Sequence, residues 1–150
     1  MNYWLFKSEP SSYSIDDLAK DKQTCWDGVR NYQARNFIRD AMKKGDKVLF
    51  YHSNTDPMAV VGVCEIVKEA YADYTAFDPD SHYYDPKSKK DNPAWMMVDI
   101  KFLKKLKNPV TLASMKDNPK LKNFRLLQRG NRLSVFPVDK SEFDEILSME

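Results

Sequence analysis

The sequence predicts an α+β fold, a small and mostly antiparallel β-barrel with helices packed on its outside. Strand-like and helix-like segments interleave along the chain. Two apolar segments, residues 48–51 and 58–67, are joined by a turn too short for a parallel crossover, so they predict a hairpin. The 150 residues have the length of one domain and contain no repeat or linker. We therefore expect a single domain over residues 1–150.

The elements of the first third follow from apolar patterns and caps. Residues 3–6 form an apolar run typical of a buried strand. Ser14, with Asp17 three residues later, predicts the start of a short helix. Within residues 34–42, apolar side chains recur with the period of an amphipathic helix, which ends before Gly45.

Residues 69–93 lack periodicity and are rich in Asp, Tyr, Pro and Lys, which predicts a long loop. Four tyrosines and a phenylalanine in this loop argue against simple disorder. Residues 95–103 then alternate between apolar and polar, as in a half-buried strand. Thr111 is placed to cap a short helix after that strand.

The C-terminal elements are punctuated by proline and by a second capping pattern. The dipeptide Asn118-Pro119 predicts another helix, which ends before Gly130. Residues 133–138 predict a last strand, and Pro137 assigns it to an edge or a strand end. Asp139 and a glutamate three residues later predict a capping box for a final helix.

The two cysteines, Cys25 and Cys64, fit neither a disulfide framework nor a metal motif. Both neighbour hydrophobic residues, so we expect small core fillers. No signal peptide precedes the first apolar run, and no segment has the apolar length of a membrane span. These features predict an intracellular, cytoplasmic protein.

Signatures of enzymes are scarce. The four glycines are too far apart for a phosphate-cradling loop, and His52 and His82 lack metal-ligand spacing. A hydrolase arrangement of Cys25, His52 and Asp27 is an alternative that sequence alone leaves open. The main expectation is a protein with no catalytic residues, no metal and no cofactor.

Charge is distributed unevenly along the chain. Residues 101–132 carry ten basic side chains and one acidic one, a net charge of +9, while the remainder sums to −7. A local excess of this size is typical of a surface that contacts phosphates. An ordinary solvated surface is the alternative, and both interpretations stay open. Lys101, Lys104 and Lys105 are expected to follow a strand into a turn.

Residues 26–36 are the most distinctive segment, because a tryptophan beside a glycine is followed by arginine, asparagine, tyrosine and glutamine side chains. An aromatic stacking surface with amide groups is suited to bind a planar base. The alternative is a core tryptophan with polar helix caps. Polar side chains also follow the strand candidates at residues 7–9 and 51–54, and these three clusters converge if the strand ends share one rim.

These residues resemble the EVE domain family. The resemblance lies in residues 4–10, 26–36, 45–53, 83–88, 92–95 and 132–138 and covers nearly the whole chain. It implies a PUA-like fold, similar to YTH and ASCH domains, and binding of DNA or RNA that carries a modified base. Modified cytosine in DNA is the leading ligand that it implies.

By analogy with the aromatic cage of YTH domains, Trp26 is expected to stack on the base beside Lys7 and Ser8. Asn31 and Ser53 are candidates to read the base edge, and a tyrosine of the long loop is a candidate to close the cage. The expected base pocket comprises Lys7, Ser8, Trp26, Val29, Arg30, Asn31, Tyr32, His52, Ser53, Tyr83 and Tyr84. The expected phosphate contacts are Arg35, Lys101, Lys104, Lys105, Arg129 and Arg132.

Other functions stay open at this point. The chain could be a reader of RNA or an accessory subunit of an enzyme that modifies RNA or DNA. It could also be a protein-interaction adaptor whose pocket holds no base. The residues do not identify the modification, the biological process or the oligomeric state.

Overall fold

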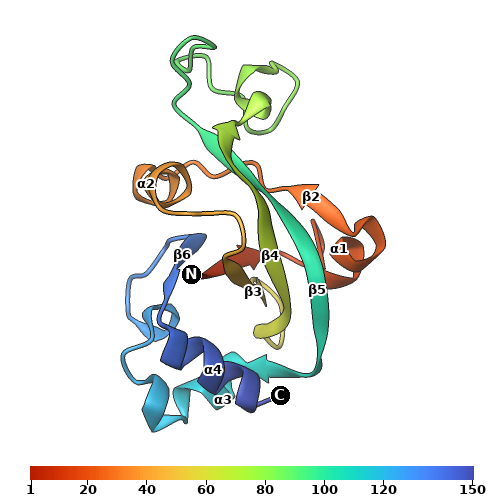
Figure 1. Cartoon of the computed structure of the whole chain (residues 1–150), viewed down its shortest axis with the longest axis vertical. Coiled ribbons are helices and arrows are strands. Elements are labelled where there is room, and N and C mark those ends of the chain that lie inside the picture. Colours follow the sequence, from red (N-terminus) through yellow and green to blue (C-terminus); the bar gives the residue numbers. More distant parts are fainter.

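The computed structural model describes residues 1–150 and has six strands in one sheet with four α-helices (Figure 1). The strands are β1 (Tyr3–Ser8), β2 (Gln23–Cys25), β3 (Lys47–His52), β4 (Ala59–Ala72), β5 (Met96–Thr111) and β6 (Val135–Val138). The helices are α1 (Ile15–Asp21), α2 (Tyr32–Asp40), α3 (Leu112–Lys116) and α4 (Lys140–Ser148), with 3₁₀ turns at Tyr74–Phe77, Pro119–Leu121 and Arg125–Leu127.

The strand order is β2-β5-β4-β3-β1-β6, and every pairing is antiparallel except β1 with β3. The α+β class and the predominance of antiparallel pairing are therefore confirmed. The two edge strands, β2 and β6, are not paired with each other, so closure into a barrel is not confirmed. β2 was not predicted, because its three residues are too few to show a strand period.

The hairpin of β3 and β4 is confirmed, and β4 and β5 are longer than the sequence predicts. β4 continues to Ala72 because Tyr71 and Ala72 pair with Met97 and Met96. Four register shifts interrupt the pairing of β4 with β5, and such bulges increase the local bend and twist of a sheet. The loop at residues 73–95 therefore projects from the far ends of two long strands (Figure 1).

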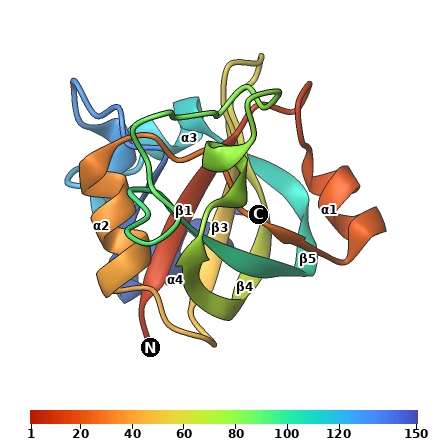
Figure 2. The same cartoon turned by 90° about the horizontal axis from the view of Figure 1, so that it is seen from above.

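Helices α1, α3 and α4 begin where the sequence predicts, whereas α2 begins at Tyr32, ahead of the predicted start at Ala34. Ser14 and Asp17 form the capping box of α1, and Asp139 forms the corresponding box of α4. The helix expected from Asn118 to Gly130 is wrong, because two 3₁₀ turns separated by the extended backbone of Phe124 occupy this segment. α1 and α2 lie on opposite sides of the strands (Figure 2).

The core is formed by the apolar strands and by one side of each α-helix. Trp4, Phe6 and Phe50 are fully buried on the neighbouring strands β1 and β3. Cys64 is a buried core residue as predicted, and its burial raises the pKa of its thiol. None of the helices combines the length and the hydropathy that crossing a membrane requires.

Candidate functional site

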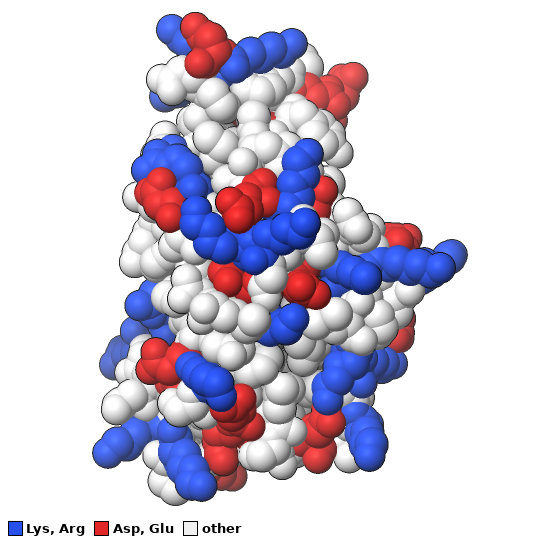
Figure 3. Space-filling view, in the orientation of Figure 1, with Lys and Arg blue, Asp and Glu red and all other residues white.

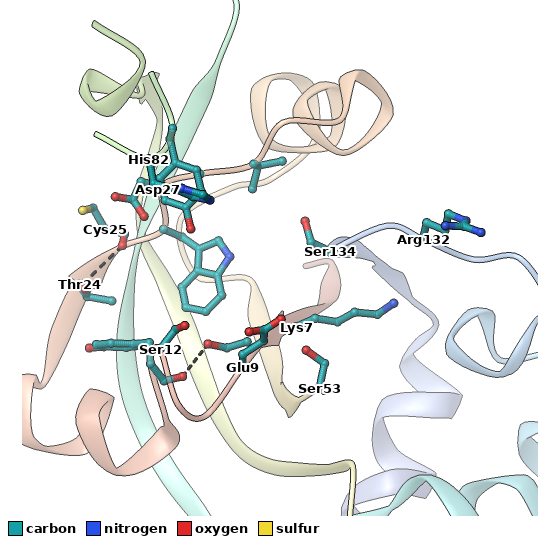
Figure 4. Close-up of a pocket in the computed structure, with 16 residues that line it drawn as sticks. Lys7, Glu9, Ser12, Thr24, Cys25, Asp27, Ser53, His82, Arg132 and Ser134 are labelled. Atoms are coloured by element: carbon teal, nitrogen blue, oxygen red, sulfur yellow. Dashed lines mark hydrogen bonds between the residues drawn. The ribbon is translucent and has the colours of Figure 1, made fainter. Parts of the chain in front are cut away.

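A cavity of about 710 Å³ lies where β1 and β3 end (Figure 4). Because these two strands are parallel, their carboxyl ends meet at one edge of the sheet, with Ser8 opposite His52. The Ser53 amide donates to the Ser8 carbonyl oxygen at 3.0 Å and continues this edge. The cavity is lined by Lys7, Ser8, Glu9, Ser12, Tyr13, Thr24, Cys25, Trp26, Asp27, Gly28, Val29, Ser53, His82, Tyr83, Arg132 and Ser134.

Trp26 is held in this cavity by aromatic side chains of β1, of β3 and of the segment between β1 and α1. Its ring lies 5.3 Å from the ring of Phe6, 5.6 Å from Phe50 and 6.5 Å from Tyr13. Its backbone amide donates to the Val98 carbonyl at 2.8 Å. The core thus orients Trp26, while its ring still contributes to the cavity surface.

A second aromatic wall is supplied by Tyr83 of the long loop. Its ring lies directly on Gly28, since a Cβ atom at Gly28 would be 2.5 Å from the ring. Arg30 donates to the Tyr83 carbonyl oxygen at 2.7 Å, and its guanidinium lies 5.5 Å from the Tyr83 ring centroid. Arg30 therefore positions a cavity wall without lining the cavity itself.

The buried carboxylate of Asp73 fixes the positions of Gly28 and Arg30 beside Tyr83. Its side chain is fully buried and accepts hydrogen bonds from the Gly28 amide at 2.8 Å, the Arg30 guanidinium at 2.9 Å and the Thr75 amide and hydroxyl. Burial raises the pKa of the Asp73 carboxyl, but the hydrogen bonds from Thr75, Gly28 and Arg30 outweigh it and lower that pKa overall. One ionised carboxylate thus joins the two loops that carry Trp26 and Tyr83.

Charged and polar side chains lie at both ends of the cavity. Asp27, Cys25 and His82 lie at one end, and Lys7, Arg132 and Ser134 lie at the other (Figure 4). Burial, and then the charge of the nearby Asp73, raise the pKa of Asp27. Burial lowers the pKa of Lys7. The cavity therefore combines aromatic walls with Asp27 at one end and two cations, Lys7 and Arg132, toward the other, where Glu9 also lies beside Lys7 (Figure 4).

A smaller hollow of about 410 Å³, the arginine hollow, adjoins the end of the cavity that holds Lys7 and shares Arg132 with the cavity. Arg125 and Arg129 also line it, and none of these three arginines forms an ion pair. Asn131 orders the loop by donating to the Arg125 carbonyl at 3.1 Å. The remaining lining residues are Asn31, Gln33, Gly130 and Leu133, and none is acidic. The hollow is suited to an anion.

Of the eleven residues expected in the base pocket, six line the cavity: Lys7, Ser8, Trp26, Val29, Ser53 and Tyr83. The other five serve the surrounding structure or lie outside. Asn31 caps α2 by accepting from the Ala34 amide at 3.0 Å, and Tyr32 stacks on Trp95 at 4.7 Å. Tyr84 is exposed and outside the lining, and Arg30 braces Tyr83.

His52 also lies outside the lining, because its Nε2 accepts the Ile15 amide of α1 at 3.1 Å. Cys25 and Asp27 line the cavity, so the structure does not bring His52 into it with them as a hydrolase arrangement requires. The expectation that Cys25 is core filler is wrong, because Cys25 is partly exposed and its sulfur lies 3.8 Å from the Tyr74 hydroxyl. No group of three or more His, Cys, Asp or Glu side chains is arranged to hold a metal.

Among the six expected phosphate contacts, Arg129 and Arg132 line the arginine hollow. Arg35 donates to the Ala94 carbonyl at 2.6 Å, and Lys104 and Lys105 pair with Glu150 and Asp16. Lys101 is exposed on β5. The three lysines lie within β5, so the turn expected there is wrong. On the face of the molecule shown in Figure 3, acidic and basic side chains are interspersed.

Sequence reasoning missed several lining residues, among them Ser12, Thr24 and Ser134. Ser12 follows the end of β1, and Ser134 precedes β6, which pairs with β1. A polar residue near a strand end was a usable signal at Ser12, whereas Ser134 falls inside the predicted strand 133–138, which begins only at Val135 in the structure. Thr24 gave no such signal, because β2 itself was not predicted.

Comparison with known proteins gives close similarity over the whole chain. The EVE domain model matches residues 2–149. Human thymocyte nuclear protein 1 is 48% identical over 168 aligned residues, which cover 99% of this chain and 74% of the human protein. A Leishmania major hypothetical protein shares 52% identity at a TM-score of 0.93, covering 99% of this chain and 94% of that chain.

The human THYN1 protein has been solved in complex with DNA that contains 5-methylcytosine. That structure matches with a TM-score of 0.92 and 45% identity, covering 99% of this chain and 96% of that chain. An ASCH protein from Zymomonas mobilis matches with a TM-score of 0.57 and 8% identity, which shows similarity of fold alone.

Proposed function

Because the chain belongs to the EVE domain family, we propose that it is a non-catalytic module that binds nucleic acid through a modified base held in the Trp26 cavity. Modified cytosine in DNA is the leading ligand. The complex of the human THYN1 protein with 5-methylcytosine-containing DNA supports this choice. Residues 1–150 act in this proposal as one unit, and a cytoplasmic location stays a prediction.

One observation carries the proposal: a core-anchored tryptophan and a loop tyrosine line one cavity of about 710 Å³. This volume lies within the usual range for small-ligand pockets. Stacking of a base on an aromatic ring contributes about 1–3 kcal/mol. Burial of a base methyl group adds on the order of 1 kcal/mol, so shape and hydrogen bonds must supply further selectivity.

A base in a duplex must leave the stack before it reaches such a cavity, which costs a few kcal/mol. Contacts with the flanking phosphates offset this cost. Arg129 and Arg132 are the best candidates, since both line the hollow next to the cavity and neither has an acidic partner. Contacts from Arg35, Lys101, Lys104 and Lys105 stay predictions, and three of these four already bind other residues.

The test is a titration of the protein with short oligonucleotides that differ in one central base: cytosine, 5-methylcytosine, 5-hydroxymethylcytosine or N6-methyladenine. Fluorescence anisotropy gives each affinity in DNA and in RNA. We expect one modified base to bind several-fold more tightly than its plain counterpart, and Trp26→Ala to lose this preference. Tyr84→Ala is the matched control, because Tyr84 is exposed and does not line the cavity.

Binding without any preference for a modified base, or a preference that persists in Trp26→Ala, would contradict the proposal. Absence of salt-dependent binding to every oligonucleotide would favour a protein-interaction adaptor. Conversion of the modified base by the isolated protein would favour an enzyme.

A further inference from the structure

We propose that Asp27 makes the cavity selective for bases with an exocyclic amino group opposite the glycosidic bond, that is, cytosine-type and adenine-type bases. Thymine-type bases carry a carbonyl oxygen there and are rejected. The inference rests on the proposed function and extends it, because it names the class of base rather than the modification.

Asp27 is the cavity carboxylate that has no hydrogen-bond or ion-pair partner in another residue. Its side chain forms no hydrogen bond and no ion pair with another residue, although it lines the cavity next to Trp26. The other lining carboxylate, Glu9, accepts a hydrogen bond from the Asn54 side chain at 3.3 Å. Burial and then the charge of Asp73 raise the pKa of Asp27, and they outweigh the hydrogen bond from its own backbone and the charge of Arg30, which lower it. A hydrogen-bond donor on the ligand would offset that rise.

The two cations of the cavity orient a nucleotide. Lys7 and Arg132 lie at the end that adjoins the arginine hollow, and Asp27 lies at the opposite end (Figure 4). The anionic sugar–phosphate backbone is therefore directed toward Lys7 and Arg132. In a pyrimidine the ring atom that carries the amino or carbonyl group lies directly across the ring from the glycosidic nitrogen, so this group is directed toward Asp27.

The hydrogen-bonding chemistry at that end decides which bases fit. An ionised carboxylate only accepts hydrogen bonds. The N4 amino group of cytosine donates to it, as does the N6 amino group of adenine, which keeps one N–H after a single methylation. The O4 atom of thymine is an acceptor, so it would face the carboxylate without a proton between them.

Thymine and 5-methylcytosine provide the sharpest comparison. Both bases carry the same 5-methyl group, and they differ in the group at C4 and in the proton at N3. Single-stranded oligonucleotides with either base at the same central position remove any contribution from mismatched pairing. We expect wild type to bind 5-methylcytosine at least about five-fold more tightly than thymine, the lower end of what one specific base contact provides.

Asp27→Asn is the diagnostic variant, because its amide can donate to O4 as well as accept from N4. We expect the ratio of the two affinities to fall to within about two-fold, while the preference for 5-methylcytosine over cytosine persists. Glu9→Gln is the matched control, since it also removes a cavity carboxylate, and it should keep the wild-type ratio. Urea unfolding establishes that each variant is folded, and Asp27→Ser replaces Asp27→Asn if that variant does not fold.

The outcomes separate this inference from the proposed function. If wild type binds thymine and 5-methylcytosine with equal affinity, and both more tightly than cytosine, the role of Asp27 is overturned and recognition of the 5-methyl group is left intact. Equal binding of cytosine and 5-methylcytosine, with both well above thymine, would support Asp27 and overturn recognition of the modification. An unchanged ratio in folded Asp27→Asn would also overturn the inference.

Discussion

Replacing Gly28 by alanine tests how the cavity wall is built. Gly28 has φ of +79°, a conformation in which an L-residue is strained, and a Cβ atom there would lie 2.5–2.7 Å from three atoms of the Tyr83 ring. Gly45 offers a matched control, because its φ is +95° and its Cβ would have no neighbour within 4 Å. The two substitutions share the backbone strain, and only the one at Gly28 adds a steric clash.

The magnitudes follow from these two terms. Left-handed backbone costs a residue with a Cβ about 1–2 kcal/mol, so Gly45→Ala should lower the free energy of unfolding by about that amount. Insertion of a methyl group into packed atoms costs about 1–3 kcal/mol more. Gly28→Ala should therefore lower the free energy of unfolding by this amount beyond the loss in Gly45→Ala. Gly28→Ala should also weaken binding of the modified oligonucleotide, because the Tyr83 ring must move away.

Urea unfolding measures both losses, provided that the dependence of the free energy on urea stays constant among the variants. A double-mutant cycle with Tyr83→Ala isolates the clash. In the Tyr83→Ala background, the cost of Gly28→Ala should fall to that of Gly45→Ala. If Gly28→Ala costs no more than Gly45→Ala in wild type, or if its cost is unchanged without the Tyr83 ring, the packing of Tyr83 on Gly28 is refuted.

Three further predictions follow from the same structure. Asp73→Asn should lower the free energy of unfolding by about 2 kcal/mol or more at neutral pH, because several hydrogen bonds to a buried carboxylate are lost or weakened. Because folding lowers the pKa of Asp73, the difference in unfolding free energy between wild type and Asp73→Asn should be complete above about pH 5 and shrink as the pH falls below about 4. A difference that stays constant in urea unfolding from pH 7 to 3 would contradict this prediction. Arg129→Ala should reduce the slope of log affinity against log salt concentration by about 0.7 for single-stranded DNA. Lys44→Ala is the control and should leave this slope unchanged, because Lys44 is exposed and precedes β3, far from the cavity end of that strand. Equal slopes for Arg129→Ala and wild type would exclude a phosphate contact by Arg129. A thiol reagent should modify the cavity-lining Cys25 and spare the buried Cys64, and mass spectrometry locates the label. Bound oligonucleotide should slow the modification of Cys25. A modification rate that oligonucleotide leaves unchanged would show that Cys25 lies outside the binding site.

Local patterns were enough to predict most elements of the fold. The capping boxes at Ser14 and Asp139 and the alternation along β5 depend on neighbours within a few residues, and the structure confirms them. The pairing of β2 with β5 joins residues far apart in sequence, and the three residues of β2 carry no period. The extended pairing of β4 with β5 and the bulges within it also depend on cross-strand partners, which sequence periodicity cannot reveal.

The candidate site was predicted where stacking chemistry and strand ends coincide, as at Trp26, Lys7 and Ser53. The predicted pocket residues that do not line the cavity include polar side chains whose partners lie in other elements. Arg30 resembles a base-reading residue by type, but a buried Asp73 and the Tyr83 carbonyl oxygen engage its guanidinium. His52 is engaged in the same way by the backbone of α1. Sequence alone cannot separate a polar group that supports a site from one that contacts a ligand.

The indole N–H resonances provide the most direct test that a modified base enters the cavity. The three tryptophans should give three such signals in a proton–nitrogen correlation spectrum, which single Trp→Phe substitutions assign. Trp4 and Trp95 donate to Asp46 and Asp85 at 2.9 and 2.7 Å, so they serve as internal references. An oligonucleotide with 5-methylcytosine should shift the Trp26 signal far more than the other two, and at lower concentration than its cytosine counterpart. An unmoved Trp26 signal under conditions where that oligonucleotide is bound would contradict the central claim.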